Sequence, residues 1–299
     1  MSFRVRTTLS RALLIALLSS TGGTALAQTP PLPAAAIEVR QVMSGGDLDR
    51  AIELAEAWAG REPQNSQAFL WLGRVYGRQA LEASMFTKLS WAGKCREAWE
   101  NAVKLDGSNI DAHFDLLSYY LQAPGIAGGG RDKAEAALAA IDAQHASYGE
   151  LARGQIAASD KDLVAAQRHF EAAVAADTSS IRARTALANL HLREQRNSDA
   201  RGVWQQVLQA DPDNVYAIYQ LGRLAALTGE ELEQGLGQLD QFLAVTDKPS
   251  DLSVEGAHWR RGQILAKLGR KDEARAALQL ASAGDKQVAE LAKADLQKL

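Results

Sequence analysis

The chain has 299 residues, of which 46% are hydrophobic and 23% charged, with 33 basic against 36 acidic side chains. This acidic balance argues against nucleic acid and anionic membrane surfaces as partners, because both require a basic footprint. Cys95 is the only cysteine, so an internal disulfide is excluded and stability must come from packing.

Residues 1–27 have the pattern of a cleavable export signal. Three arginines without acids precede an apolar run at residues 12–18, and Ala25-Leu26-Ala27 supplies a small-x-small cleavage site. The run is shorter than the roughly 20 residues of a membrane helix, and no Cys follows the cleavage site, so we expect neither stable membrane insertion nor a lipid anchor. We expect a mature chain that begins near Gln28 and lies in the periplasm, with secretion as the alternative.

A helix-pair repeat can be read between Ile181 and Asn214. Apolar or small residues recur at helical spacing over residues 183–190, a polar break follows, and a second periodic run ends at Asp211-Pro212. The unit fills 34 residues, which is the tetratricopeptide repeat (TPR) period, and its small, aromatic and Pro positions resemble the TPR pattern.

The same frame fits the rest of the mature chain, with small residues where the helices of a pair cross. The eighth position of the units holds Gly73, Leu117, Gly154, Ala188, Gly222 and Gly262. The twentieth position, on the second helix, holds Ala51, Cys95, Ala134, Ala166, Ala200, Gly235 and Ala274. A large side chain at this crossing would force the two helices apart.

The resemblance to TPR proteins covers nearly all of the mature chain and implies an all-α fold. We expect a right-handed superhelical solenoid of about seven degenerate helix-turn-helix repeats. The expected organisation is a signal peptide at 1–27, a short linker at 28–34, the repeat array at 35–284 and a capping helix at 285–299. Such a cap keeps the end of an array from exposing an apolar face.

Two units exceed the repeat period. The first insertion includes residues 82–91, which we interpret as a lengthened helix pair with an extra apolar contact from Phe86 and Trp91; a ligand-binding lip is the alternative. The second includes the Gly-rich stretch 119–130, which lacks the Gly-Lys-Ser/Thr of a phosphate loop and the preceding strand of a dinucleotide site.

We interpret the Gly-rich stretch as a structural turn. Pro124 would end one helix, Gly128 to Gly130 would be free to adopt positive φ, and Asp132 would begin the next helix. The surrounding residues, LLSYYLQAPGIAGGGRDKA, resemble a group of exported bacterial TPR proteins, a likeness that implies no defined activity.

In TPR proteins the first helix of each pair lines a concave groove, with its second, fifth and ninth positions facing inward. The resemblance therefore implies a ninth-position row of hydrogen-bonding side chains and a mostly apolar fifth-position row, which together suit an extended peptide. The expected partner-binding residues are Arg74, Phe114, Ser118, Tyr148, Gln155, Arg182, Asn189, Tyr219, Arg223, Trp259 and Gln263. An ordinary solvated helix face with stray core aromatics is the alternative.

Chaperone-binding TPR domains hold a C-terminal carboxylate with Lys and Asn at set positions. Only Asn189, Arg182, Arg193 and Arg223 approximate such a clamp here, and the ninth-position row contains no Lys. A ligand with a free carboxylate therefore stays an open possibility.

The sequence contains no motif for catalysis or metal binding. Its five histidines are scattered and form no HExxH or Cys/His cluster. His113 and Asp115 would point about 200° apart on a helix, so we interpret His113 as a lone surface histidine. Cys95 occupies a crossing position, where a thiol acts as a small apolar side chain. We expect no enzymatic activity, no cofactor and no metal.

The expected function is a protein–protein interaction scaffold in the cell envelope, which binds a partner peptide or protein and no nucleic acid. A chaperone-like holder of exported polypeptides is the alternative. An enzyme with an unrecognised site and self-association through the outer faces or ends of the array are two further classes. The repeat pattern is specific for fold and does not identify the partner.

Overall fold

The computed structural model describes residues 32–299 apart from 247, 250–251 and 284–285. The expected signal peptide and most of the expected linker lie outside these described residues. Within them the chain forms fifteen α-helices and one short 3-10 helix, with no β-strand. The prediction of an all-helical fold is confirmed.

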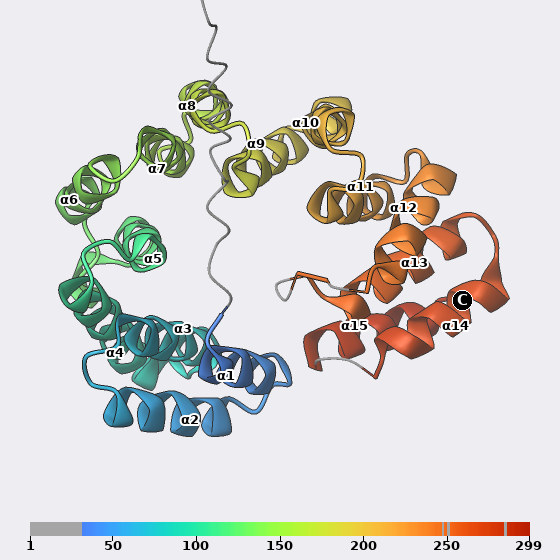
Figure 1. The fold of residues 1–299 in the computed structure, drawn as a ribbon. Helices are drawn as coiled ribbons and strands as arrows, with labels where there is room; N and C mark the ends of the chain where they lie inside the picture. Colours follow the sequence, from blue (N-terminus) through green and yellow to red (C-terminus); the bar gives the residue numbers. More distant parts are fainter. Residues whose placement is uncertain (1–31, 247, 250–251, 284–285) are drawn as a thin grey trace, which may run out of the picture. The chain divides into compact units, whose positions relative to one another are not determined.

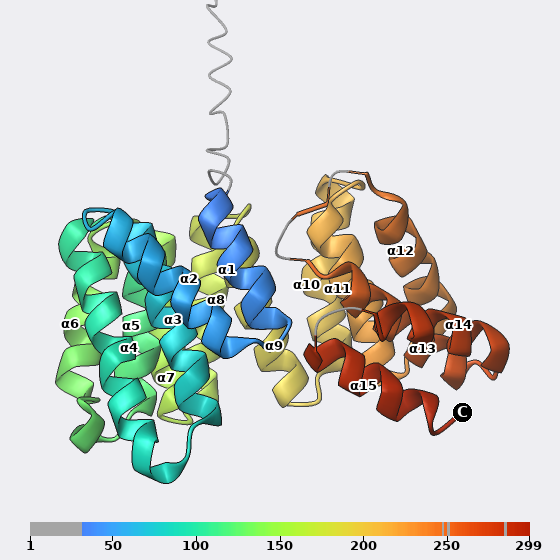
Figure 2. The same cartoon turned by 90° about the horizontal axis from the view of Figure 1, so that it is seen from below.

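The helices follow one another as first and second members of seven pairs (Figure 1). The first helices are α1 (Ala34–Ser44), α3 (Ser66–Glu82), α5 (Ile110–Gln122), α7 (Ala146–Ser159), α9 (Ile181–Arg193), α11 (Val215–Thr228) and α13 (Val254–Lys267). The second helices are α2 (Leu48–Arg61), α4 (Met85–Leu105), α6 (Arg131–Asp142), α8 (Leu163–Ala176), α10 (Asn197–Ala210), α12 (Leu232–Ala244) and α14 (Lys271–Ala281). A last helix, α15 (Lys286–Leu296), lies beside α13 and α14 (Figure 2).

The first helices form one layer and the second helices form the other. First helices of consecutive units contact one another directly at α1/α3, α5/α7, α7/α9 and α11/α13. The apolar core lies between the two layers and contains large, fully buried side chains such as Trp58, Trp204 and Phe242. A helical residue that points away from this core therefore lies on the surface of its own layer.

Polar side chains begin most of the first helices. Each accepts a hydrogen bond from a backbone N–H two or three residues further along and so satisfies a donor that the helix itself leaves unpaired. The capping residues of α3, α5, α9, α11 and α13 are Asn65, Asn109, Ser180, Asn214 and Ser253.

Glycine at the eighth position allows the two helices of a pair to approach closely. A Cβ added to Gly222 would lie 3.1 Å from the carbonyl oxygen of Gly235, and one added to Gly262 would lie 3.3 Å from that of Ala274. Both carbonyls belong to twentieth-position residues, and all seven twentieth-position residues are buried. The predicted crossing is confirmed.

The space left by these glycines is filled by a large side chain from the second helix. A Cβ on Gly73 would overlap the ring of Trp99, and a Cβ on Gly154 would overlap the ring of Phe170. Each ring lies one helical turn after the twentieth position of its unit. At Gly222 and Gly262 the side chains of Leu239 and Leu278 take the place of the ring. At each of these four crossings, a large side chain of the second helix therefore occupies the space that the glycine leaves free on the first helix, and we call this arrangement the interlock.

The first insertion lengthens α3 and α4, as predicted, and Trp91 packs on Tyr76 with 5.6 Å between ring centroids. The predicted contact from Phe86 is wrong, because this side chain is 98% exposed. Helix α4 has 21 residues and the next helix, α5, has 13. At 1.5 Å per residue, α5 is too short to cover the whole of α4, and Phe86 lies in the uncovered first turn.

The Gly-rich insertion is a structural turn, as predicted. Helix α5 ends ahead of Pro124, a 3-10 turn, η1 (Gly125–Ala127), follows, and the Tyr119 hydroxyl donates a 2.6 Å hydrogen bond to the carbonyl of Ala127. Helix α6 begins at Arg131, one residue before the predicted start.

The glycines of this turn meet different constraints. Gly128 has φ of +87°, in the left-handed region that favours glycine. A Cβ on Gly129 would overlap the carbonyl group of Ala123. Gly130 has an extended backbone, so positive φ occurs at one of the three predicted positions.

The isolated thiol and the histidine singled out in the sequence are both buried. Cys95 is 2% exposed, and burial raises the pKa of its thiol, as expected for a small core residue. His113 is 5% exposed and its Nε2 hydrogen-bonds with the Gly107 carbonyl at 2.9 Å. The expectation of a surface histidine is wrong, because the first turn of α5 packs against the preceding loop, whose carbonyl forms this hydrogen bond with the ring.

Across the part of the chain that the structure describes, every helix is too short or too polar to cross a lipid bilayer.

The helix crossing can be tested with two Gly→Ala variants. Gly154→Ala should lower the free energy of unfolding by about 1–3 kcal/mol, because the new methyl group overlaps the buried Phe170 ring. Gly202→Ala, inside α10 with nothing within 4 Å of an added Cβ, should raise it by about 0.5–1 kcal/mol through helix propensity. Urea unfolding followed by circular dichroism measures both. Equal stabilisation by the two variants would contradict the interlock.

Candidate functional site

The expected partner-binding residues separate into three groups on the first helices. The first group joins α3, α5, α7 and α9 and consists of Arg74, Phe114, Tyr148 and Arg182. The second group lies in a groove on α5, α7 and α9 and consists of Ser118, Gln155 and Asn189. The third group lies on α11 and α13 and consists of Tyr219, Arg223, Trp259 and Gln263.

The first group is already engaged in contacts between units. Arg74 donates through Nε to Asp115 at 2.7 Å and lies 3.7 Å from Asp111. Arg182 pairs with Asp111 and covers the Phe114 ring at 4.8 Å. Burial raises the pKa of Asp115, and the positive charge of Arg74 acts against that shift. Arg74 therefore joins neighbouring repeats, whereas Arg182 of α9 joins its own repeat to the one that contains α5, two units away.

The expected apolar strip at the fifth position is wrong for three units. Leu70, Phe114 and Leu151 are 0%, 4% and 1% exposed. On a helix the fifth position lies between the buried eighth position and the exposed ninth, about 60° from one and 40° from the other. Packing against neighbouring helices therefore decides whether a fifth-position side chain points into the core or towards solvent. In these three units it points into the core. Phe114 contacts Tyr148 edge-on, with 6.1 Å between the ring centroids.

The second group lines a groove of about 320 Å³. Ninth-position side chains from three consecutive first helices, Ser118, Gln155 and Asn189, meet in it. Its remaining lining residues are Leu121, Gln122, Ala158, Ser159, Phe170, Ala186, Leu190 and Arg193. The structure thus brings together side chains that lie more than 30 residues apart in the sequence.

Unused hydrogen-bonding groups face this groove. The Gln155 Oε1 atom is buried and has no hydrogen-bond partner among the described residues. Asn189 and Arg193 are exposed, and their side chains form no hydrogen bond or ion pair within that part of the chain. Gln155 Oε1 can only accept, Arg193 can only donate, and Asn189 can do both. A buried acceptor left without a donor costs about 1–3 kcal/mol, which a ligand N–H group would recover.

A second row of polar side chains, which the prediction from the ninth position does not include, lines the same groove. Gln122, Ser159 and Arg193 each follow a ninth-position residue by four, so they lie one turn further along the same helix face. Helical spacing alone could have identified these thirteenth-position residues.

The third group is only partly engaged. The Trp259 Nε1 and Gln263 Nε2 atoms both donate to Asp295 of α15, each at 2.9 Å. Tyr219 packs edge-on against Phe242 with 4.9 Å between centroids. Arg223 donates to the neutral amide oxygen of Gln220 at 3.3 Å. Trp259 and Gln263 thus hold α15 in place, whereas the charge of Arg223 has no carboxylate partner among the described residues.

A larger hollow of about 520 Å³ lies beside the turn between α2 and α3. Residues 62–67 of that turn and Asp106 line it. Its polar groups are used locally, since the Asn65 amide donates to Glu62 at 2.6 Å and its side chain caps α3. This hollow contains none of the expected partner-binding residues.

Comparison with known proteins supports the repeat. Residues 157–213 and residues 230–288 each match a family model described as tetratricopeptide repeat. The sequence has no match among curated proteins.

Three solved structures are similar to this chain at low identity, and the two with TM-scores above 0.5 share its fold. Yeast Tom70 is 16% identical over 85% of this chain and 51% of its own, with a TM-score of 0.54. A monomeric IFIT1 mutant with m7Gppp-AAAA is 14% identical over 85% of this chain and 59% of its own, with a TM-score of 0.57. A tetratricopeptide repeat protein from Parabacteroides merdae is 16% identical over 87% of this chain and 96% of its own, with a TM-score of 0.47. The chain thus spans little more than half of Tom70 and IFIT1.

The two family matches show tetratricopeptide repeats at residues 157–213 and 230–288, and the helix pairs with their crossing residues extend the same repeat fold along the described chain. Proteins of this family generally act as non-catalytic scaffolds for protein–protein interaction.

Two histidines, the buried His191 and the half-buried His258, make stability depend on pH. Burial lowers the pKa of His191 and of His258, and the Nδ1 atom of each has no hydrogen-bond partner among the described residues. The unfolded chain, with a histidine pKa of about 6.5, therefore takes up these protons first as the pH falls. Stability that is present above about pH 6.5 is lost as the pH falls towards the folded-state pKa values.

We predict that the free energy of unfolding declines between about pH 7 and 5, and that the His191→Gln/His258→Gln double variant declines less steeply. Urea titrations at several pH values give both slopes. Identical slopes would show that the two rings do not control this dependence.

Proposed function

We propose that this protein is an interaction scaffold that holds an extended segment of a partner protein in the groove on α5, α7 and α9. The observation that carries the proposal is the convergence of polar side chains from three consecutive first helices on one groove, where Gln155 Oε1, Asn189 and Arg193 have no side-chain partner among the described residues. The location of the binding site is inferred from the geometry of this groove, because the family matches support only a general role as an interaction scaffold.

The chemistry of the groove suits a peptide backbone. Gln155 Oε1 would accept a hydrogen bond from a backbone N–H, while Asn189 and Arg193 would donate to backbone carbonyls. Leu121 and Ala158, both half-buried, supply apolar surface beside these polar groups. Neighbouring helices pack about 8–10 Å apart, so three helices span about 20 Å, which matches about six residues of extended chain.

We further propose that the scaffold acts in the cell envelope and that its partner is a protein rather than a nucleic acid. The basic, apolar and small-x-small order of residues 1–27 supports export. Removal of its three arginines leaves 30 basic against 36 acidic residues, a balance that disfavours phosphate backbones.

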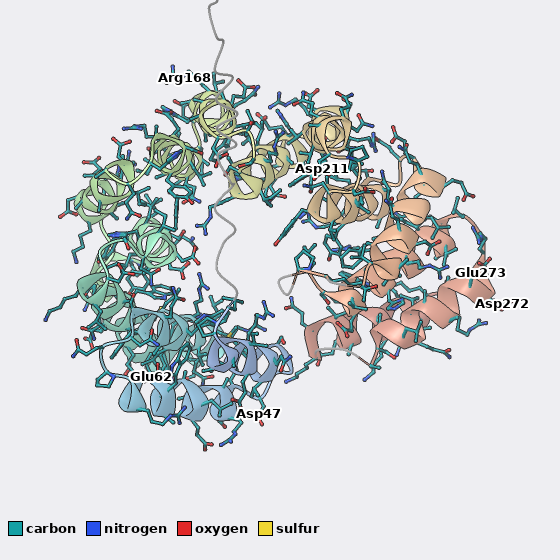
Figure 3. The ribbon with its side chains drawn as sticks, in the orientation of Figure 1. Asp47, Glu62, Arg168, Asp211, Asp272 and Glu273 are labelled. Atoms are coloured by element: carbon teal, nitrogen blue, oxygen red, sulfur yellow. The ribbon has the colours of Figure 1, made fainter. Side chains whose placement is uncertain are left out.

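Site-specific photocrosslinking in cells tests the groove. A photoreactive residue replaces Asn189, which is exposed in the groove on α9. The matched control replaces Arg168, which is exposed on the outer side of α8 (Figure 3). We expect a discrete adduct from position 189 and none from position 168, and we expect Gln155→Ala with Arg193→Ala to reduce the adduct about tenfold. The same adducts from both positions would refute the groove.

A chaperone-like holder is the second candidate, because the polar groups of the groove recognise backbone, which every polypeptide has. In that case the probe at position 189 would give many adducts of different mass, whereas a dedicated scaffold gives one or a few. Mass spectrometry of the adducts separates the two functions.

A further inference from the structure

The turn that joins α3 to α4 projects beyond the ends of the neighbouring helices (Figure 2). Helix α4 has 21 residues, whereas α5, which packs beside it, has 13 and leaves the start of α4 uncovered. Residues 86–90 are all exposed. We call residues 81–90, the end of α3 and the start of α4, the α3–α4 tip.

Large apolar side chains gather on the α3–α4 tip. Leu81 is 72% exposed, Phe86 is 98% exposed and Leu89 is 46% exposed. Eight large apolar side chains are exposed among the described residues, and these three lie within one stretch of nine residues. Single exposed apolar side chains are normal, but a cluster of them indicates a surface that a partner or a membrane covers.

The α3–α4 tip and the helical turns behind it carry a positive charge. Residues 78–94 contain three basic side chains, Arg78, Lys88 and Lys94, against one acid, Glu82. Glu82 accepts a hydrogen bond from Arg78 at 3.0 Å. Lys88 and Lys94 are exposed, and neither forms an ion pair within the described residues. Two uncompensated positive charges therefore accompany the apolar side chains.

Trp91 and Lys94 lie at the border between the exposed tip and the packed part of α4. The Trp91 ring is half-buried, and the Lys94 Nζ atom lies 4.5 Å from its centroid. Segments that rest on a bilayer place Trp and Lys at the level of the headgroups and insert Phe and Leu more deeply. Phe86 precedes Trp91 by five residues, about 7.5 Å along the helix axis, within the roughly 5–10 Å that such segments reach.

We propose that the α3–α4 tip is a contact site for an anionic phospholipid surface. Leu81, Phe86 and Leu89 enter the boundary between headgroups and acyl chains, while Lys88 and Lys94 stay among the headgroups, to which they are attracted. A second copy of this chain is a poorer occupant, because two such tips would bring their lysines together.

This contact differs from the membrane interactions that the sequence disfavours. The acidic balance describes the whole chain, whereas the charge of residues 78–94 is positive. Interfacial contact at this depth also requires no membrane-spanning helix. None of the tip residues lines the groove on α5, α7 and α9, so the groove and the lipid contact can fail independently.

Co-sedimentation with vesicles tests the proposal. Residues 33–299 form one compact unit, so the test uses residues 28–299, without the apolar run at 12–18 that would itself bind lipid. We expect binding to vesicles of mixed phosphatidylglycerol and phosphatidylcholine. Binding to pure phosphatidylcholine should be about 25-fold weaker, because each of the two lysines contributes about fivefold. Equal binding to both vesicles, or binding to neither, would overturn the proposal.

Variants locate the contact. Phe86→Ser should weaken binding to the anionic vesicles about tenfold, because the ring no longer leaves water. It should leave the free energy of unfolding in urea unchanged, because this side chain is 98% exposed. Lys88→Gln should weaken binding about fivefold. The matched control, Val164→Ser, removes an 82% exposed apolar side chain from α8 and should leave binding unchanged.

Two results with these variants contradict the lipid contact. The first is an equal loss of vesicle binding in Phe86→Ser and Val164→Ser, or no loss in the Leu81→Ser/Phe86→Ser double variant. The second is a dimer or a crosslinked protein that depends on Phe86 while vesicle binding is absent, which would assign the α3–α4 tip to a protein partner instead.

Discussion

The close approach of the two helices in each pair is the constraint on which the rest of this structure depends. Where the eighth position is glycine, as at Gly73, Gly154, Gly222 and Gly262, the first helix lies almost against the backbone or side chains of the second. A large side chain of the second helix, aromatic at Trp99 and Phe170 and leucine at the other two crossings, then fills the space that the glycine leaves free. This interlock fixes the rotation of the first helix about its axis. Because that rotation is fixed, the ninth and thirteenth positions face away from the core and become available to a partner.

Polar side chains on the first-helix layer serve two purposes. Arg74 and Arg182 are compensated by Asp111 and Asp115 and tie α3, α5 and α9 together across units. Removing one member of such a partly buried pair would leave a charge without its partner. Groups such as Asn189, Arg193 and Arg223 have no carboxylate partner in the described chain. The presence or absence of a carboxylate partner therefore distinguishes the side chains that hold the repeats together from those that are available to a binding partner.

Helix pairs, crossing residues and the ninth-position row could be predicted because each follows from the spacing of residues along one helix. The fifth position could not, because it lies between the buried and exposed sides, and only the packing of Phe114 against Tyr148 and Arg182 settles its direction. Phe86 was misplaced for a related reason: its exposure depends on the length of α5, a different helix. The engagement of Trp259 and Gln263 depends on Asp295 of α15, again a different helix. The spacing of residues along one helix does not reveal contacts that depend on the length and position of another helix.

The proposed function requires the first helices of consecutive repeats, and not the second helices, to present the binding surface. Hydrogen–deuterium exchange of the full chain, with and without the partner recovered by crosslinking at Asn189, distinguishes the two layers. We expect slower amide exchange in α5, α7 and α9 when the partner is bound, with α6, α8 and α10 unchanged. Slower exchange confined to α6, α8 and α10 would contradict it.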